Sequence, residues 1–253
     1  MSSGSAVRGV VTLVLTLLAG AASAAEVVVA VAANFAKPME EVAARFKART
    51  GHEVRLSVGA TGTFYRQIVN GAPFDALLAA DAETPQRLEA EHRSVPGSRF
   101  TYAVGRLVLW SADTGRVDRQ GRVLAGGQFA RLAIASPDLA PYGRAARSVL
   151  MKLGVWEAVR PKLVTGENVN QTFTFVATKN ADLGFVALSQ VKSLDPSRAG
   201  SMWIIPTELH EPLVQDAVLL EKGKDNTAAR ELLDFMRSAE IRSHLIQLGY
   251  ATP

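Results

Sequence analysis

Short apolar runs alternate along most of this chain with segments in which apolar residues recur every three or four positions. The runs Val27–Val31 and Leu132–Ala135 are typical of strands buried on both faces of a sheet. The segment Phe35–Arg49 places its apolar residues on one helix face, so it predicts an amphipathic helix that ends at Gly51. Strands that alternate with helices in this way imply an α/β fold with mostly parallel sheets covered by helices.

The same two patterns predict the remaining elements. Further strands are expected at Val54–Val58, Phe74–Ala80, Val104–Trp110, Leu183–Ala187, Trp203–Ile205 and Val214–Leu220. Further helices are expected over 63–70, 86–91, 140–153 and 169–177, and one long helix is expected over 227–248. The glycine-rich stretch 116–127 predicts a loop with a short helix.

Four strands end at a turn that starts a helix, at Asn34, Gly59–Gly62, Ala140–Gly143 and Asn168–Asn170. Asn34 stands where an N-cap residue is expected. The first N–H groups of a helix lack partners and point outward, so such a junction can bind an anion. An ordinary capped helix gives the same local pattern. Four junctions at the carboxyl ends of strands, where ligands of such sheets bind, favour a ligand site.

Residues 1–25 have the features of a signal peptide. Arg8 forms a basic start, Val10–Ala22 is apolar, and Ala22-Ser23-Ala24 resembles a cleavage signal, with cleavage after Ala24 or Ala25. The chain has no cysteine, so it has no disulfide and no acylation site for a lipoprotein anchor. We therefore expect a periplasmic protein, exported through its N-terminal signal peptide.

The charge of the chain gives little support to a nucleic-acid partner. Lys and Arg number 28 against 24 Asp and Glu, and removing Arg8 leaves 27 against 24, a charge of +3. No basic cluster with interleaved aromatic residues is present, so no nucleic acid is expected as a partner. The four histidines are far apart and lack the spacing of a metal site.

Several motifs give the chain a resemblance to a known family. They are VAVAANFAKPMEEVAARF, the GATGT turn, NGAPFDALLAADAETPQRLE, SPDLAPYGRAARSVLMKLGVW and GENVNQTFTFVATKNADLGFVALSQ. In this order they resemble the molybdate-binding periplasmic proteins of ABC importers. The resemblance implies a two-lobed periplasmic-binding-protein fold of type II, with the ligand cleft between lobes. Lobe one would comprise 26–105 plus 212–253, and lobe two 106–211.

The resemblance also implies a function without chemistry. The protein would be a monomer that captures molybdate or tungstate, needs no cofactor, and delivers the anion to an inner-membrane ABC permease. Molybdenum or tungsten would enter only as the bound oxyanion, with no direct metal ligand from the protein. An enzyme on the same fold, with Thr61 or Ser136 as nucleophile, is a weaker alternative because neither has a base beside it in the sequence.

A fully deprotonated tetrahedral anion only accepts hydrogen bonds, so its site should offer donors. The junctions supply the side chains of Asn34 and Thr61, and the resemblance implies main-chain contacts from Tyr142 and Val169. Ala33 stands where some relatives have a hydroxyl residue, so only its backbone can donate. Sulfate and thiosulfate remain alternative ligands, whereas phosphate, which often keeps a proton, favours a site with a carboxylate.

A few residues could change this contact list. Ala187 stands where many relatives have a tyrosine donor, and the amide of Asn34 is a candidate to replace it. Arg66 and Arg144 follow two of the junctions and could neutralise an anion, although surface positions are the commoner role. Glu167 lies next to the fourth junction and is the one carboxylate that could oppose an anion there.

Overall fold

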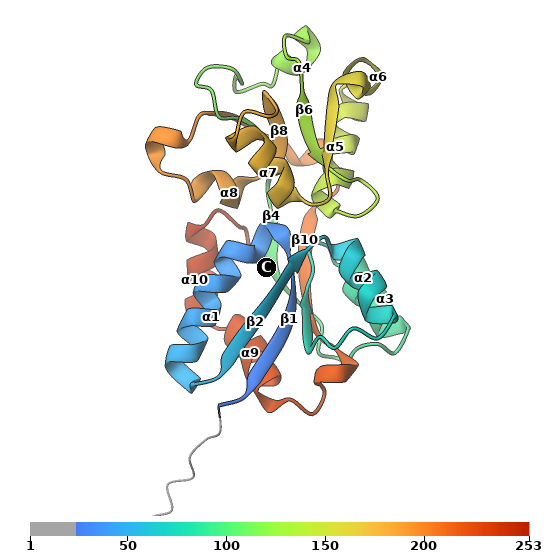
Figure 1. Cartoon of the computed structure of the whole chain (residues 1–253), viewed down its shortest axis with the longest axis vertical. Coiled ribbons are helices and arrows are strands. Elements are labelled where there is room, and N and C mark those ends of the chain that lie inside the picture. Colours follow the sequence, from blue (N-terminus) through green and yellow to red (C-terminus); the bar gives the residue numbers. More distant parts are fainter. Residues whose placement is uncertain (1–23, 253) are drawn as a thin grey trace, which may run out of the picture.

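The computed structural model describes residues 24–252 and contains two five-stranded sheets, one below the other in Figure 1. The lower sheet has the order β2-β1-β3-β10-β4. Its strands are β1 (Glu26–Ala32), β2 (Glu53–Gly59), β3 (Ala76–Leu78), β4 (Phe100–Gly105) and β10 (Leu213–Leu219). Only β10 runs against the other four strands, so this sheet is mostly parallel, as predicted.

The upper sheet repeats this arrangement with the order β7-β6-β8-β5-β9. Its strands are β5 (Leu107–Ser111), β6 (Leu132–Ala135), β7 (Leu163–Gly166), β8 (Leu183–Ala187) and β9 (Ser201–Ile204). Here β5 alone runs against the others. The α/β fold expected from the sequence, with two sheets each covered by helices, is therefore confirmed.

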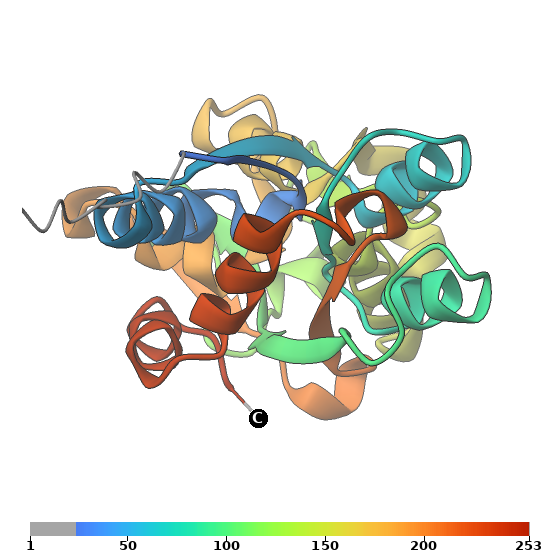
Figure 2. The same ribbon diagram turned by 90° about the horizontal axis from the view of Figure 1, so that it is seen from below.

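Helices cover both faces of the lower sheet, as Figure 2 shows from below. They are α1 (Ala36–Thr50), α2 (Thr61–Val69), α3 (Glu83–Ala90), α9 (Thr227–Met236) and α10 (Ala239–Gln247). Alternate residues of β1 face opposite sides: Val29 packs with α1 and α9, whereas Ala30 packs with α2 and α3. This two-sided burial explains why β1 is a continuous apolar run.

The upper sheet is covered in the same way. Its helices are α4 (Val123–Gly126), α5 (Pro141–Lys152), α6 (Trp156–Val159), α7 (Val169–Ala177) and α8 (Leu188–Lys192). A cluster of buried apolar residues fills both faces of this sheet and continues to the edge of the lower one, where it includes Ala32, Ala60 and Ala80. The two sheets thus meet through a shared apolar boundary.

The chain crosses from one sheet to the other at 105–107, where the sequence predicts an unbroken strand. Instead of one strand over Val104–Trp110, β4 ends at Gly105 and β5 begins at Leu107 in the other sheet, with Arg106 exposed between them. Because the residues on each side are buried in their own sheet, hydrophobicity alone does not reveal the change. Residues 205–212 carry the chain back to β10.

Three other predictions of local structure are wrong. The expected helix 227–248 is broken, because Ser238 caps a new helix by accepting from the N–H of Ile241. The strand expected over Phe74–Ala80 is only three residues long. Asn34 is not an N-cap: it lies inside a short 3-10 helix, Ala33–Phe35, that precedes α1, and no side chain caps either helix.

The last residues of the chain return to the crossing. Val104 and Ala251 exchange backbone hydrogen bonds, with N···O distances of 2.6 and 3.0 Å. Within residues 24–252, no helix has the length and apolar character that crossing a lipid bilayer requires. The signal peptide expected at 1–25 falls almost wholly outside the described residues.

Candidate functional site

The four strand-to-helix junctions meet at one small cavity between the two sheets. Ala33, Asn34, Thr61, Tyr142 and Val169, all expected at the site from the sequence, line this cavity together. Its volume is about 10 Å³, close to the space that a single water molecule needs. An occupant larger than a water molecule, held by all four junctions at once, therefore needs this cavity to widen.

Each of the three α-helices that begin at the cavity presents one backbone amide without a partner. Within residues 24–252, the N–H groups of Thr61, Tyr142 and Val169 make no hydrogen bond. The next amides are occupied: Gly62 N–H donates to the carbonyl of Leu139 at 2.9 Å, from the lower part of the molecule to the upper. The unpaired donors are thus concentrated at the cavity, with the positive ends of three helix dipoles behind them.

The helix that begins at Val169 shows why only the first amide of a helix is left unpaired. The Oδ1 atom of Asn168 caps α7 by accepting from Asn170 N at 3.0 Å and Gln171 N at 3.1 Å. The cap satisfies the second and third amides and leaves the first amide available. An Asn directly before a helical pattern predicts this cap from sequence alone.

The hydroxyl of Thr61 is oriented by the protein backbone. Its Oγ1 accepts from the N–H of Ala80 at 3.0 Å, and the side chain is almost completely buried. Because the oxygen lone pair is used by Ala80, the hydroxyl hydrogen remains to donate toward the cavity. Thr61 can therefore offer two donors, its amide and its hydroxyl.

Asn34 lies in a buried polar network that the sequence did not predict. Its Nδ2 donates to Gln215 Oε1 at 3.0 Å and lies 3.4 Å from the hydroxyl of Tyr250, which itself donates to the Asn34 carbonyl. Tyr250 also accepts from Ser189, so the network joins the 3-10 helix before α1, β10, α8 and the C-terminal residues. The partners of Asn34 are 181 and 216 positions away, so no local motif indicates them.

Tyr142 connects the upper part of the molecule to the same network. Its hydroxyl lies 3.4 Å from Gln215 Nε2. This contact needs a glycine at the crossing: a Cβ on Gly105 would lie 2.2 Å from the Tyr142 hydroxyl and 2.5 Å from Gln215 Nε2. The close approach explains why β4 ends in glycine, and it brings a residue of the cavity against the crossing strand.

Comparison with known proteins identifies the family. The profile described as bacterial extracellular solute-binding protein matches residues 27–251. A molybdate-binding protein ModA of Azotobacter vinelandii is 55% identical over 243 residues, which are 96% of each chain. The chain belongs to the bacterial extracellular solute-binding proteins. A ModA protein of Rhodobacter capsulatus is 49% identical over 93% of this chain and 92% of its own.

A solved structure agrees with this assignment. The periplasmic molybdate-binding protein of Azotobacter vinelandii superposes with a TM-score of 0.87 and 39% identity, covering 90% of this chain and 99% of its own. The two-lobed periplasmic-binding-protein fold expected from the sequence is therefore confirmed. The contacts that the five cavity residues make with a ligand remain a prediction.

Two larger grooves of this solute-binding protein lie between the sheets, and both carry carboxylates. The groove of about 440 Å³ is lined by Asp81 and Glu83, and the groove of about 230 Å³ by Glu40 and Glu41. Each groove has only one cation in its lining, Arg144 and Lys37 respectively, against at least two carboxylates that oppose a bound anion, so these grooves are poor anion sites. Among the described residues, the small cavity is lined by no carboxylate, lysine or arginine, and Glu167 is exposed outside it.

The two candidate arginines lie away from the cavity. Arg144 pairs with Asp81 at 2.7 Å, from α5 of the upper part to the turn before α3, and Arg66 is exposed on α2. Ala187 is fully buried and does not line the cavity. No group of three or more metal-binding side chains occurs within residues 24–252.

The buried tyrosines make stability sensitive to strongly alkaline pH. Burial raises the pKa of Tyr102 and Tyr142 well above the usual 10, and that of Tyr250 to about 12. A raised pKa in the folded state stabilises the fold below pH 10, and this stabilisation is lost as pH rises from 10 toward 12. Urea unfolding at pH 9 to 11.5 should show this decline, and the decline should be shallower in Tyr250→Phe. A stability that does not change up to pH 11.5 would contradict the burial of these phenols.

Proposed function

We propose that this protein captures molybdate, and also tungstate, in the periplasm and delivers it to an inner-membrane ABC permease. The observation that carries the proposal is a cavity where three unpaired amides and a buried hydroxyl converge without an opposing carboxylate. Such a set of donors suits a small anion that keeps no proton. The names of its relatives at 55% and 49% identity support molybdate as the anion.

The proposal includes the organisation of the molecule. Residues 26–105 plus 212–253 form one lobe and 106–211 the other, consistent with the membership of the two sheets. Ala33, Asn34 and Thr61 bind the anion from the first lobe, and Tyr142 and Val169 bind it from the second. Residues 1–25 serve as the signal peptide, and the mature protein acts as a monomer without a cofactor and without catalysis.

Calorimetric titration of the purified mature protein with molybdate, tungstate, sulfate and phosphate tests this proposal. Molybdate and tungstate are expected to bind at least about tenfold more tightly than the other two, a difference of about 1.4 kcal/mol. The names of the relatives favour molybdate over sulfate, and hydrogen phosphate brings a proton that finds no acceptor among the lining residues. Sulfate that binds as tightly as molybdate would make sulfate the proposed ligand instead.

The ion pair between Arg144 and Asp81 is expected to make a small contribution to affinity. It joins the two lobes, both residues line the 440 Å³ groove, and the Arg144 side chain is 45% exposed. Exposed pairs contribute about 0.2–1 kcal/mol, so Arg144→Ala should weaken molybdate binding by no more than about fivefold. Asp81→Asn should give the same change, and Arg66→Ala none, in titrations at two salt concentrations. A much larger loss in Arg144→Ala alone would place the guanidinium on the anion.

A further inference from the structure

Asn34 and Gln215 share a hydrogen bond in which one atom is left without a partner. The two side chains are 3% and 0% exposed, and Asn34 Nδ2 donates to Gln215 Oε1. In this orientation Asn34 Oδ1 has no hydrogen-bond partner within the described residues. A buried acceptor without a donor costs about 1–3 kcal/mol, so this orientation of the amide is unfavourable.

The hydroxyl groups of the two tyrosines beside Gln215 are also incompletely matched with hydrogen-bond partners. The hydroxyl of Tyr102 lies 2.9 Å from the carbonyl of Ala79 and 3.1 Å from Gln215 Oε1, but its single hydrogen can serve only one acceptor. The hydroxyl of Tyr142 accepts from Gln215 Nε2, which leaves its own hydrogen without an acceptor in the described part of the chain. Three groups around Gln215 are therefore incompletely paired.

Turning both carboxamides by 180° removes these three mismatches and gives up only the 3.4 Å contact between Asn34 Nδ2 and the Tyr250 hydroxyl. The turn exchanges nitrogen and oxygen at nearly unchanged positions, so the hydrogen-bond partners decide which end is which. Gln215 Nε2 then donates to Tyr102 and to Asn34 Oδ1, Gln215 Oε1 accepts from Tyr142, and Tyr102 donates to Ala79. Every polar atom of Gln215 is now paired.

One donor remains unpaired after the turn, and it belongs to a residue that lines the cavity. Asn34 Nδ2 takes the position at which Oδ1 had no partner. An N–H group there is complementary to an oxyanion, whereas an oxygen there would repel it. The orientation of the Gln215 amide thus decides whether Asn34 attracts or repels the anion.

We propose that Gln215 is a positioning residue that holds the Asn34 carboxamide with its nitrogen toward the cavity. The inference rests on the proposed function. Tyr102 and Tyr142 hold the Gln215 amide in this orientation, because the Tyr102 hydroxyl accepts from its nitrogen and the Tyr142 hydroxyl donates to its oxygen. Gln215 also sets specificity, since an Asn34 oxygen at the cavity would favour an anion that keeps a proton, such as hydrogen phosphate.

A double-mutant cycle with Asn34→Ala and Gln215→Met tests the proposal by molybdate titration. Asn34→Ala should weaken binding by about ten- to a hundredfold, since it removes a donor to a charged acceptor. Gln215→Met should weaken binding by about tenfold in the parent but by less than about threefold in the Asn34→Ala background, because it acts through Asn34. Gln190→Met is the matched control, as Gln190 bonds Asn170 and Ala187 but not Asn34, and its effect should be equal in both backgrounds.

Each outcome decides one question. An equal loss from Gln215→Met in both backgrounds, or no loss in the parent, overturns the positioning role while molybdate binding stands. A parent that binds no molybdate overturns the proposed function and the inference with it. If thermal unfolding shows that a variant does not fold, NMR of the parent decides: the Asn34 side-chain N–H resonances should shift when molybdate is added, and unshifted resonances overturn the inference.

Discussion

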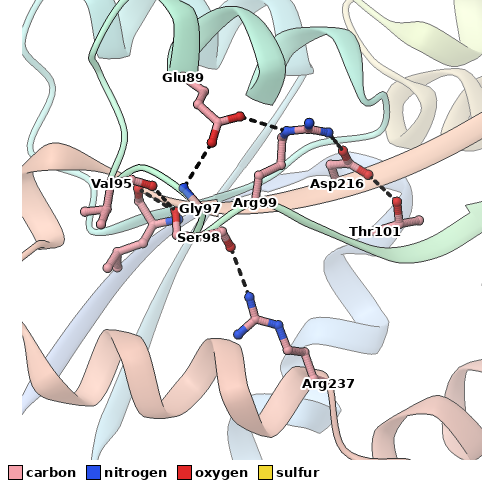
Figure 3. Close-up of polar contacts among 9 residues, drawn as sticks. Glu89, Val95, Gly97, Ser98, Arg99, Thr101, Asp216 and Arg237 are labelled. Atoms are coloured by element: carbon pink, nitrogen blue, oxygen red, sulfur yellow. Dashed lines mark hydrogen bonds and ion pairs between the residues drawn. The ribbon is translucent and has the colours of Figure 1, made fainter.

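Replacing Arg99 by methionine is expected to lower the free energy of unfolding by about 3 kcal/mol. Figure 3 shows Arg99 between Glu89 and Asp216. Arg99 donates to Asp216 at 2.8 Å, and Asp216 on β10 is 1% exposed. Removing one partner of a buried pair costs about 3–5 kcal/mol, because the remaining charge stays out of water. The lower end applies here, since the Arg99 side chain is 35% exposed and Thr101 still donates to Asp216 at 2.7 Å.

Urea unfolding of the parent and of two variants measures this effect. Arg160→Met is the matched control, because Arg160 pairs with Glu157 at 3.6 Å on the surface with side chains 65% and 76% exposed. Its effect should stay within about 0.5 kcal/mol. Equal free energies of unfolding of the two variants would show that Arg99 does not stabilise the buried Asp216 carboxylate.

Replacing Thr61 by alanine is expected to weaken molybdate binding by about ten- to a hundredfold. The change removes a hydroxyl whose hydrogen is available to the anion, and hydrogen bonds to charged groups contribute about 1.5–3 kcal/mol. It also leaves the buried N–H of Ala80 without its acceptor, so stability should fall by about 1–3 kcal/mol as well. Calorimetry measures the first effect and urea unfolding the second.

Thr61→Ser is the matched control because it keeps the hydroxyl and its bond to Ala80. It should retain affinity within a few-fold. Its free energy of unfolding should also stay close to that of the parent, because the hydroxyl is kept. Wild-type affinity in a folded Thr61→Ala variant would remove Thr61 from the set of donors.

The sequence predicts the junctions well because their signals are local. Asn168 before an apolar period, the GATGT turn and the proline at 141 each mark a helix start within a few residues, and the structure begins α7, α2 and α5 at those places. The convergence of these starts follows from a rule of α/β sheets, whose strands end at a common edge.

The polar interior could not be predicted, because its partners are distant in the chain. In the sequence, Asp216 is an isolated charge within an apolar strand, and its partner Arg99 lies 117 positions earlier. Gln215 and Tyr250 carry no pattern that connects them with Asn34. The apolar pattern alone does not show the strand crossing at Gly105, where the family resemblance places a lobe boundary, because the apolar run is continuous while the sheet that buries it changes.

The place of β10 in the lower sheet determines the order in which the molecule can fold. The upper sheet is contiguous, since β5 to β9 span 107–204, and its pairings are complete once those residues have been synthesised. The lower sheet needs β10, from 213–219, between β3 and β4, so it closes a loop of more than a hundred residues. Closing a loop of this length costs conformational entropy, so we expect the lower sheet to be completed after the upper one. A chain that ends before β10 lacks Gln215 and cannot assemble the Asn34 network, so the environment of this cavity residue depends on the last strand of the protein.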